Sequence, residues 1–144
     1  MDAIRTHRRL DPRLTGTPEE LGDGHSEVVL VPGPETAADE TGLVHGGFVF
    51  GLADHAAMLA VNHANVVLAG AQVRFLAPVT VGERLVARAR RLSEEGSESR
   101  PVVEVEVLAG GEPVFAGTFR CAVPAEHVLA RGPRGRRQGE EGAP

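Results

Sequence analysis

The chain has 144 residues, of which 42 % are hydrophobic and 24 % are charged, and its formal net charge is −5 at pH 7. This length and composition are typical of one globular domain. The negative charge and the absence of Trp and Tyr argue against a nucleic-acid partner. The single cysteine, Cys121, excludes an internal disulfide framework. Because no apolar run is long enough for a membrane span and the first residues lack an apolar signal core, we expect no membrane partner and a cytoplasmic location.

Composition divides the chain into three zones. Residues 1–24 are polar and broken by Pro and Gly, which predicts a loose N-terminal arm. Residues 25–124 carry nearly all of the apolar periodicity and form the predicted domain. Residues 125–144 are a C-terminal extension, predicted to be disordered from about Arg131 because almost no apolar residue follows it.

The predicted domain opens with a strand and a helix. The strand lies in SEVVLVPGP and is stopped by the Pro-Gly-Pro that ends this run. After a loop comes the longest apolar segment, which is rich in Ala, Leu and Met and free of Pro. It predicts a helix from about Gly46 to Asn62. Because the segment is apolar nearly all round, the helix should be buried on most of its faces.

Four strands are predicted after the helix, because the apolar period changes to two. The residues expected to share one face of their strand are Val67, Ala69, Ala71, Val73 and Phe75, then Leu85, Ala87 and Ala89. In the last two strands the residues expected to face inward are Val103, Val105 and Val107, then Phe115, Gly117, Phe119 and Cys121. Short gaps between the strands favour antiparallel neighbours. The expected fold class is α+β, with an antiparallel sheet of about five strands around one long buried helix. One helix cannot pair the sheet edges, so a partner chain is expected.

Two glycines, Gly46 and Gly47, begin the predicted helix. The first N–H groups of a helix have no acceptor within it and lie at the positive end of its dipole. With no side chain in the way, this helix start could hold an anion or a developing oxyanion. The alternative is that the glycines only permit tight packing of the helix on the sheet.

Asp54 interrupts the apolar helix. A carboxylate in such a segment is costly unless it is paired, hydrogen-bonded or facing a cavity. At 100° per residue it shares a helix face with Gly47, Phe50 and Met58, and seven residues separate it from Gly47, or ~10 Å along the axis. Asp54 and Gly47 of one chain are therefore too far apart to act on the same carbonyl carbon. A hydrogen bond to backbone at a sheet interface is the alternative role for Asp54.

The remaining polar candidates are less specific. His45 precedes the helix and could set the glycine turn or act in catalysis. No His or Cys cluster has metal-ligand spacing, so neither a metal nor another cofactor is expected. The arginines on the predicted outer face of the sheet could pair with Glu104 and Glu106 across strands. In an alternative interpretation, some arginines contact ligand phosphates, and the candidates are Arg74, Arg88 and Arg100.

The run His45-Gly46-Gly47, followed by Leu52-Ala53-Asp54 and Asn62, is similar to that of acyl-CoA thioesterases of the phenylacetate-degradation type. The later run Arg74-Phe75-Leu76-Ala77-Pro78-Val79, ending in Gly82-Glu83, resembles the same family, and the likeness covers residues from about 25 to 123. The resemblance implies a hot-dog fold and hydrolysis of an acyl-CoA to a free acid and CoA.

The resemblance also implies residue roles. An Asp at the position of Asp54 would act as nucleophile or as general base for water. The backbone N–H at the position of Gly47 would polarise the thioester carbonyl, and the two groups would come from different chains of a homodimer, possibly within a dimer of dimers. Substrate-binding positions would be Gly46, Phe50 and Met58, with Leu68 and Asp39 as two positions that depart from the family pattern. Relatives place Asn where Asp39 stands and Ser or Thr where Leu68 stands.

A second resemblance involves Ala71 to Phe75, Gly82-Glu83-Arg84, Val102 to Val105, and Val114-Phe115. These residues are similar to the effector domain of the malonyl-CoA-responsive repressor of lipid synthesis, a hot dog that binds acyl-CoA without hydrolysing it. That domain lacks the catalytic Asp, so Asp54 favours the enzyme. The sequence therefore predicts a thioesterase, with a non-catalytic acyl-CoA-binding module as the alternative.

Overall fold

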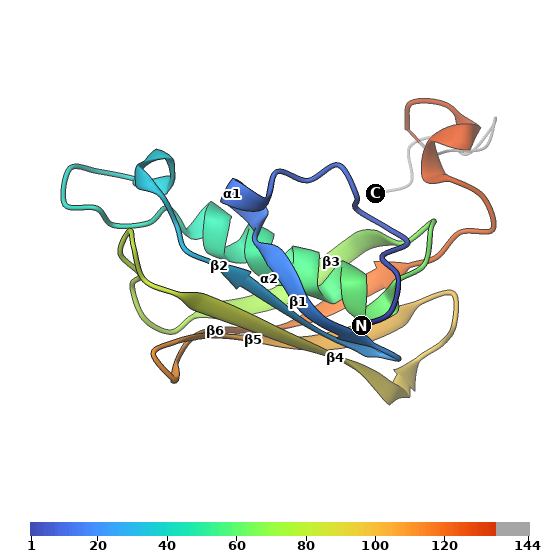
Figure 1. The fold of residues 1–144 in the computed structure, drawn as a ribbon. Coiled ribbons are helices and arrows are strands. Elements are labelled where there is room, and N and C mark those ends of the chain that lie inside the picture. The colour runs from blue at the N-terminus through green and yellow to red at the C-terminus, as the bar shows by residue number, and fades with distance from the viewer. Residues whose placement is uncertain (135–144) are drawn as a thin grey trace.

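The computed structural model describes residues 1–134. In chain order the elements are α1 (Pro12–Thr15), β1 (Thr17–Gly22), β2 (His25–Leu30), η1 (Pro34–Thr36), α2 (Gly46–Val61), β3 (Val67–Phe75), β4 (Leu85–Gly96), β5 (Pro101–Ala109), β6 (Glu112–Ala122) and η2 (Val128–Arg131). The strands form one sheet in the order β1-β2-β4-β5-β6-β3, and all neighbours are antiparallel. Helix α2 lies across one face of this sheet (Figure 1).

This arrangement confirms the expected α+β architecture of an antiparallel sheet with one long helix. The sheet has six strands and not about five, because β1 adds an edge strand beside β2. The helix begins and ends within one residue of its predicted limits. Asn62 ends it in the left-handed conformation (φ 49°), and its N–H donates to the Met58 carbonyl at 2.8 Å.

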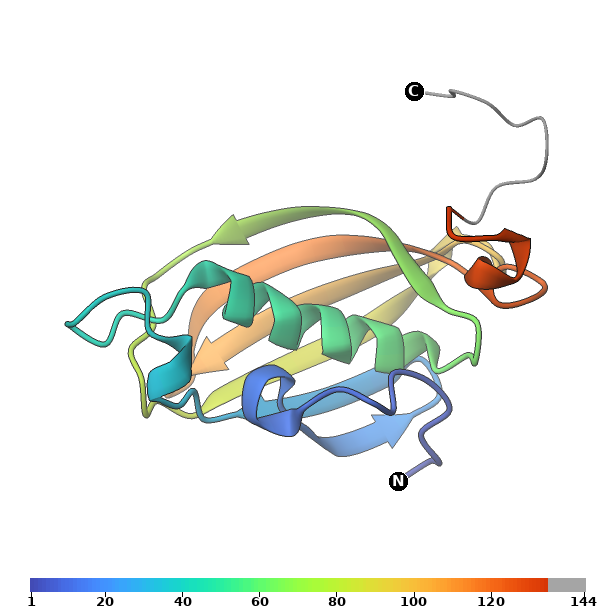
Figure 2. The same ribbon diagram turned by 90° about the horizontal axis from the view of Figure 1, so that it is seen from above.

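Helix α2 has two different flanks in the view from above (Figure 2). On one flank lie β1, β2 and α1, and on the other runs β3. The helix packs chiefly against β2, β4 and β5, and more sparsely against β6 and β3. Its core side chains are small or aliphatic, and they include Leu52, Ala56 and Leu59, all completely buried. The burial expected for an apolar helix is therefore present, with the β3 flank as its less covered side.

The N-terminal residues form ordered structure, which corrects the prediction of a loose arm over 1–24. Leu21 of β1 is buried, and its carbonyl accepts a hydrogen bond from the Asp2 N–H at 2.9 Å. The Arg5 N–H donates to Asn62 Oδ1 at 2.8 Å, and Asn62 Nδ2 donates to the Ala3 carbonyl at 2.9 Å. The composition concealed this order because β1 is an edge strand that buries one residue, so it shows no apolar alternation.

The predicted inner faces of β4, β5 and β6 are confirmed. Their inward residues are buried or half-buried against α2, while Arg88, Arg90, Glu104 and Glu106 lie exposed on the outer face. In β3 the prediction fails for Val67 and Ala69. A bulge between Leu68 and Gly70 shifts the register, so Leu68 lies opposite the inward Cys121, whereas Ala71, Val73 and Phe75 keep the predicted face.

The C-terminal extension is described as far as residue 134. It leaves β6, passes Pro124 and forms the short helix η2. The disorder predicted from about Arg131 falls mostly on residues 135–144, which lie outside the described residues. Within residues 1–134, no helix is both long and apolar enough to cross a membrane.

Candidate active site

The start of α2 presents free backbone donors. His45 is the N-cap, and its side chain makes no capping hydrogen bond. Its carbonyl accepts from the Phe48 N–H at 3.0 Å, but the N–H groups of Gly46 and Gly47 have no acceptor among residues 1–134. Gly47 is exposed. These two N–H groups can therefore donate to a ligand oxygen at the positive end of the helix dipole.

Two aromatic rings limit the space around the glycines. A Cβ on Gly47 would lie 3.1 Å from His45 Nε2, and one on Gly46 would lie 3.2 Å from Phe75 Cε1. The ring of Phe75 packs edge-on against Phe115 at 5.2 Å and is 56 % exposed. Gly46, Phe75 and Leu76 line an apolar cavity of about 360 Å³ between the helix start and the segment after β3. A ligand oxygen bound at the glycines would therefore lie next to apolar surface.

Asp54 lies two turns further along α2 and is half-buried. Its Oδ1 is buried and has no hydrogen-bond partner within the described part of the chain. Burial raises the pKa of this carboxyl from 3.8 to about 6. A buried carboxylate oxygen without a donor is destabilising, so Asp54 is not explained as a structural hydrogen-bonding group.

The neighbours of Asp54 lie on the β3 flank of the helix. Phe50, one turn before it, packs against Phe119 at 5.5 Å and Phe115 at 6.4 Å. Cys121 of β6 is close enough that the negative charge of Asp54, after burial itself, raises the thiol pKa to about 12. Gly46, Phe50 and Asp54 therefore all face the β6–β3 side, which agrees with the helical wheel for Phe50 and Asp54.

The other predicted substrate-binding residues are spread out. Leu68 is half-buried on β3, opposite Cys121. Met58 is completely buried in the core. Asp39 lies exposed in the loop before α2, where its Oδ1 accepts from the Thr41 N–H at 2.9 Å and the Thr41 hydroxyl at 2.6 Å. These hydrogen bonds lower the Asp39 pKa, so the side chain is an ionised loop cap in its own chain.

The predicted phosphate-binding arginines do not gather at the helix start. Arg88 forms an ion pair with Glu27 at 3.0 Å on the outer face of the sheet. Arg74 is exposed on that same face, beside Glu104 and Glu106. Arg100 is exposed in the turn between β4 and β5, where its N–H donates to Ser97. The cross-strand ion pairs expected from the sequence are represented by Arg90 and Glu104 at 3.6 Å.

Sequence reasoning missed Arg91. It lies opposite Val103 in the β4–β5 register, so its side chain leaves the sheet on the core face, next to the end of α2. The alternation Leu85-Ala87-Ala89-Arg91 carried the signal, because it places a charge where the apolar pattern requires a core residue. Among residues 1–134, no group of three His, Cys, Asp or Glu side chains is placed to hold a metal ion.

Comparison with known families bears on this geometry. The model of the thioesterase superfamily matches residues 41–116, which include the helix start, Asp54 and most of the sheet. The chain belongs to the thioesterase superfamily. The hot-dog fold implied by both sequence resemblances is thereby confirmed.

Two curated relatives share part of their length with this thioesterase-superfamily chain. It is 47 % identical over 116 residues to methylthioribose-1-phosphate isomerase of Aquifex aeolicus, covering 81 % of this chain and 25 % of that protein. It is 35 % identical over 77 residues to the transcription factor FapR of Bacillus cereus, covering 54 % of this chain and 39 % of that protein. The chain thus spans well under half the length of either relative.

The chain matches several solved structures over most of their length. An uncharacterized protein of Pyrococcus horikoshii is 48 % identical with a TM-score of 0.85, and the match covers 89 % of this chain and 97 % of that one. A mutant of the phenylacetic acid degradation protein PaaI of Thermus thermophilus is 28 % identical with a TM-score of 0.69, covering 77 % and 95 %. Both resemblances found in the sequence are confirmed by these relatives: PaaI is a protein of phenylacetate degradation, and FapR stands for the repressor with a hot-dog effector domain.

Proposed function

We propose that this protein hydrolyses acyl-CoA thioesters, with Asp54 as nucleophile or general base and the Gly47 N–H polarising the thioester carbonyl. The observation that carries the proposal is the buried Oδ1 of Asp54, which has no partner among residues 1–134. A pKa of about 6 leaves this carboxylate mostly ionised at neutral pH and close to the value that suits a general base. Membership of the thioesterase superfamily supports thioester hydrolysis as the reaction.

The helix start supplies the complementary group. When the thioester carbonyl is attacked, negative charge develops on its oxygen, and backbone N–H groups aimed at that oxygen stabilise the transition state. Gly46 and Gly47 offer two such donors with no acceptor of their own among the described residues. His45 lies over Gly47 and would help to hold the turn, and the adjoining apolar cavity would take the uncharged part of the substrate.

A complete site requires two chains in this proposal. Gly47 and Asp54 of one helix are ~10 Å apart along its axis, which exceeds the reach of one thioester carbon. Antiparallel contact of two α2 helices on their β3 flanks would bring Gly47 of one chain near Asp54 of the other. The result is a homodimer with two equivalent sites, and a dimer of dimers is compatible with it. Asp39, in the loop before Gly47, would enter the same composite site.

A non-catalytic acyl-CoA-binding module is the second candidate. The observation in its favour is the 35 % identity to FapR, which is a transcription factor by name. The two candidates differ in the fate of the bound ligand. A binding module would hold acyl-CoA and release no thiol, whereas an enzyme would release free CoA.

The test is thiol release from a panel of acyl-CoAs that includes short aliphatic and aromatic acyl groups. We expect turnover by the wild-type protein and a loss of ~10²–10⁴-fold in Asp54→Asn, the usual cost of removing an acid–base group. Asp23→Asn, which removes a carboxylate from the β1–β2 turn far from the helix start, is the matched control and should retain full activity. Near wild-type turnover by Asp54→Asn would refute the assigned role, and binding without turnover by the wild type would select the binding module.

A further inference from the structure

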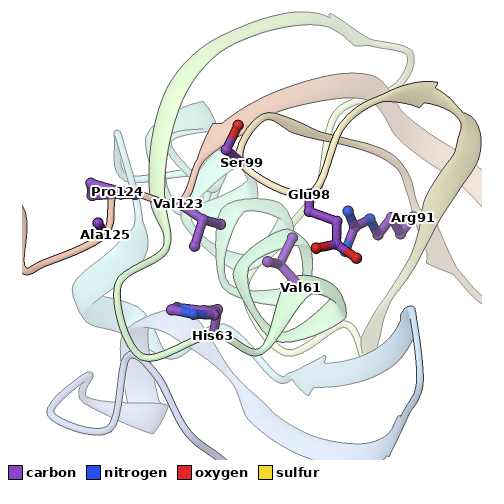
Figure 3. Close-up of a pocket in the computed structure, with 8 residues that line it drawn as sticks. All are labelled: Val61, His63, Arg91, Glu98, Ser99, Val123, Pro124 and Ala125. Atoms are coloured by element: carbon purple, nitrogen blue, oxygen red, sulfur yellow. The ribbon is translucent and has the colours of Figure 1, made fainter.

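A second cavity lies at the opposite end of α2, away from the glycine turn. Figure 3 shows it between the end of the helix, the β4–β5 turn and the segment after β6. Its volume is about 350 Å³. Val61, Val123 and Pro124 form its apolar wall, and the polar residues His63, Arg91 and Ser99 also line it. The cavity therefore combines hydrogen-bond donors with an apolar wall.

Arg91 differs from the other arginines of β4. Arg88 and Arg90 form ion pairs with Glu27 and Glu104, and Arg84, just before the strand, pairs with Glu19. Arg91 is half-buried on the core face, and no carboxylate lies within 4.0 Å of it among residues 1–134. One of its amino groups donates to the Ser97 carbonyl at 3.1 Å, which holds the guanidinium in place without neutralising its charge.

Two further donors accompany Arg91. The Nδ1 of His63 accepts from the Asn65 N–H at 2.9 Å, so in the neutral ring the proton resides on Nε2, which can donate. The Ser99 hydroxyl lies 3.4 Å from that of Ser97 and can also donate. Glu98, exposed in the β4–β5 turn, is the carboxylate that borders the cavity. Its charge reduces the local positive potential without forming an ion pair with Arg91.

We propose that this cavity binds an anionic group of the ligand, a carboxylate or a phosphate, through Arg91 with His63 and Ser99. Each of these side chains can donate a hydrogen bond to an anion, and a guanidinium matches the planar geometry of a carboxylate or phosphate edge. An acyl-CoA could supply this anion in two ways: as a carboxylate at the far end of the acyl group or as a phosphate of CoA. The identification of the ligand as an acyl-CoA rests on the proposed function.

The cavity lies far enough from Asp54 that an anion bound in it would be remote from the thioester. Val61 is seven residues after Asp54, or ~10 Å along the helix axis. Cys121 is near enough to both charges that Asp54 raises the pKa of its thiol and Arg91 lowers it. The group that Arg91 binds is therefore separated from the thioester carbon by several bonds, and Arg91 is a specificity residue that takes no part in the chemical step.

The first arm of the test uses simple anions and needs no thioesterase activity. The melting temperatures of the wild-type protein, Arg91→Gln and Arg90→Gln are measured with inorganic phosphate and with glutarate, at constant ionic strength. Arg90 is the matched control, since it precedes Arg91 and its side chain lies on the outer face in an ion pair with Glu104. At least one anion should raise the melting temperature of wild type and Arg90→Gln but not of Arg91→Gln. Equal shifts, or none, in all three proteins overturn the proposal.

The second arm identifies the source of the anion. Each arginine change is combined with Asp54→Asn, and dissociation constants are measured for glutaryl-CoA against pentanoyl-CoA and for CoA against 3′-dephospho-CoA. Arg91→Gln should weaken the binding of those ligands that carry the recognised anion by roughly 10–100-fold, the worth of a hydrogen bond to a charged group. A loss confined to glutaryl-CoA assigns the acyl carboxylate, and one shared by the ligands that carry the 3′-phosphate but not by 3′-dephospho-CoA assigns the phosphate. Equal losses on all four ligands assign the diphosphate that they share, and unchanged dissociation constants for all four contradict the proposal.

Two further variants keep the test decisive if Arg91→Gln does not fold. Ser99→Ala removes one donor from an exposed residue, and Arg91→Lys keeps the charge without the planar fork. If Arg91→Gln does not fold, both variants should lose part of the anion-dependent shift, and unchanged shifts in both overturn the proposal. Anion binding by a protein that hydrolyses no acyl-CoA would refute the proposed function and leave the anion site standing.

Discussion

The two flanks of α2 treat buried polar groups in opposite ways. On the β2 flank, the Ser26 hydroxyl donates to the Ala56 carbonyl at 2.7 Å, and His55 Nδ1 donates to the Thr15 carbonyl at 2.9 Å. Burial lowers the pKa of His55, so this ring is held neutral. On the β3 flank, the buried Oδ1 of Asp54 has no partner within residues 1–134, although the carboxyl is mostly ionised at neutral pH.

This difference separates structural polar groups from a functional one. A polar group that serves the fold is hydrogen-bonded, since an unsatisfied one costs roughly 1–3 kcal/mol and more when charged. The buried polar groups on the β2 flank are hydrogen-bonded, whereas the unpaired Asp54 Oδ1 on the β3 flank lowers the stability of the fold. Such uncompensated groups occur at sites where a substrate or another chain completes the hydrogen bonds.

After the loss already predicted for Asp54→Asn, the largest effect on turnover is expected at Gly47. A Cβ there would lie 3.1 Å from two atoms of the His45 ring and would occupy space beside the exposed helix start. In the proposed site this methyl group keeps the thioester oxygen away from the Gly47 N–H. Loss of one oxyanion donor costs about 3 kcal/mol in the transition state, so Gly47→Ala should lower kcat by ~10²-fold. The measurement is kcat alongside the melting temperature.

Gly51 provides the control for Gly47. It lies one turn further along α2, and a Cβ there meets nothing within 4 Å. Gly51→Ala should keep kcat and gain stability from its higher helix propensity. Parallel losses of activity and melting temperature in Gly47→Ala would instead support the packing role of the glycines.

The next effect is a change in stability at Asp54. Its pKa is about 6 in the folded protein and 3.8 in a solvated carboxyl, so the folded state binds the proton more tightly. The resulting penalty is absent below about pH 4, grows between about pH 4 and 6, and is complete above about pH 6. Asp54→Asn should therefore stabilise the protein at pH 8 by roughly 1–3 kcal/mol, and by less at pH 4.5.

Ser26→Ala gives the contrasting result on the other flank. It removes a satisfied hydrogen bond, so it should destabilise the protein by about 1 kcal/mol and leave turnover unchanged. Urea midpoints at the two pH values measure both effects. A loss of stability at pH 8 in both variants would show that Asp54 has a structural partner, contrary to the comparison of the flanks.

A smaller effect is expected in the pH profile. If ionised Asp54 is the reacting group, kcat/KM should fall as the pH drops through about 6 and be about tenfold lower at pH 5 than on the plateau. His7 and His55, whose pKa values are lowered by burial, lie on the other flank of the helix and not beside Asp54. A profile that is flat from pH 5 to 8 would exclude Asp54 as base or nucleophile.

The sequence predicts the elements that bury apolar residues at regular spacing. Helix α2 is located within one residue because its apolar content is continuous, and β4 to β6 are located because apolar and polar residues alternate over most of their length. Asp54 and the glycine turn also stand out, because a charge and two helix breakers conflict with their apolar surroundings. Both signals are local, so one sequence suffices to find them.

The remaining features depend on contacts that are distant in sequence. Strand β1 is recognisable only through its pairing with β2, and the bulge in β3 only through its register with β6. Within residues 1–134, Asp54 Oδ1 has no hydrogen-bond partner and Arg91 borders a cavity. Both features are properties of the packed structure, because they depend on which groups lie too far away to make contact. The spacing of residues in the sequence does not predict features of this kind.

The most direct test of the central claim mixes chains that carry Asp54→Asn with chains that carry Gly47→Val. Each homodimer should be nearly inactive, because every site lacks either the carboxylate or an unobstructed helix start. A mixed dimer holds one site with both defects and one with neither, so each mixed dimer should recover about half of the wild-type activity, with its composition established by mass spectrometry. Mixed dimers that remain as inactive as the parents would place Asp54 and Gly47 in separate roles within one chain and contradict the composite site on the β3 flank.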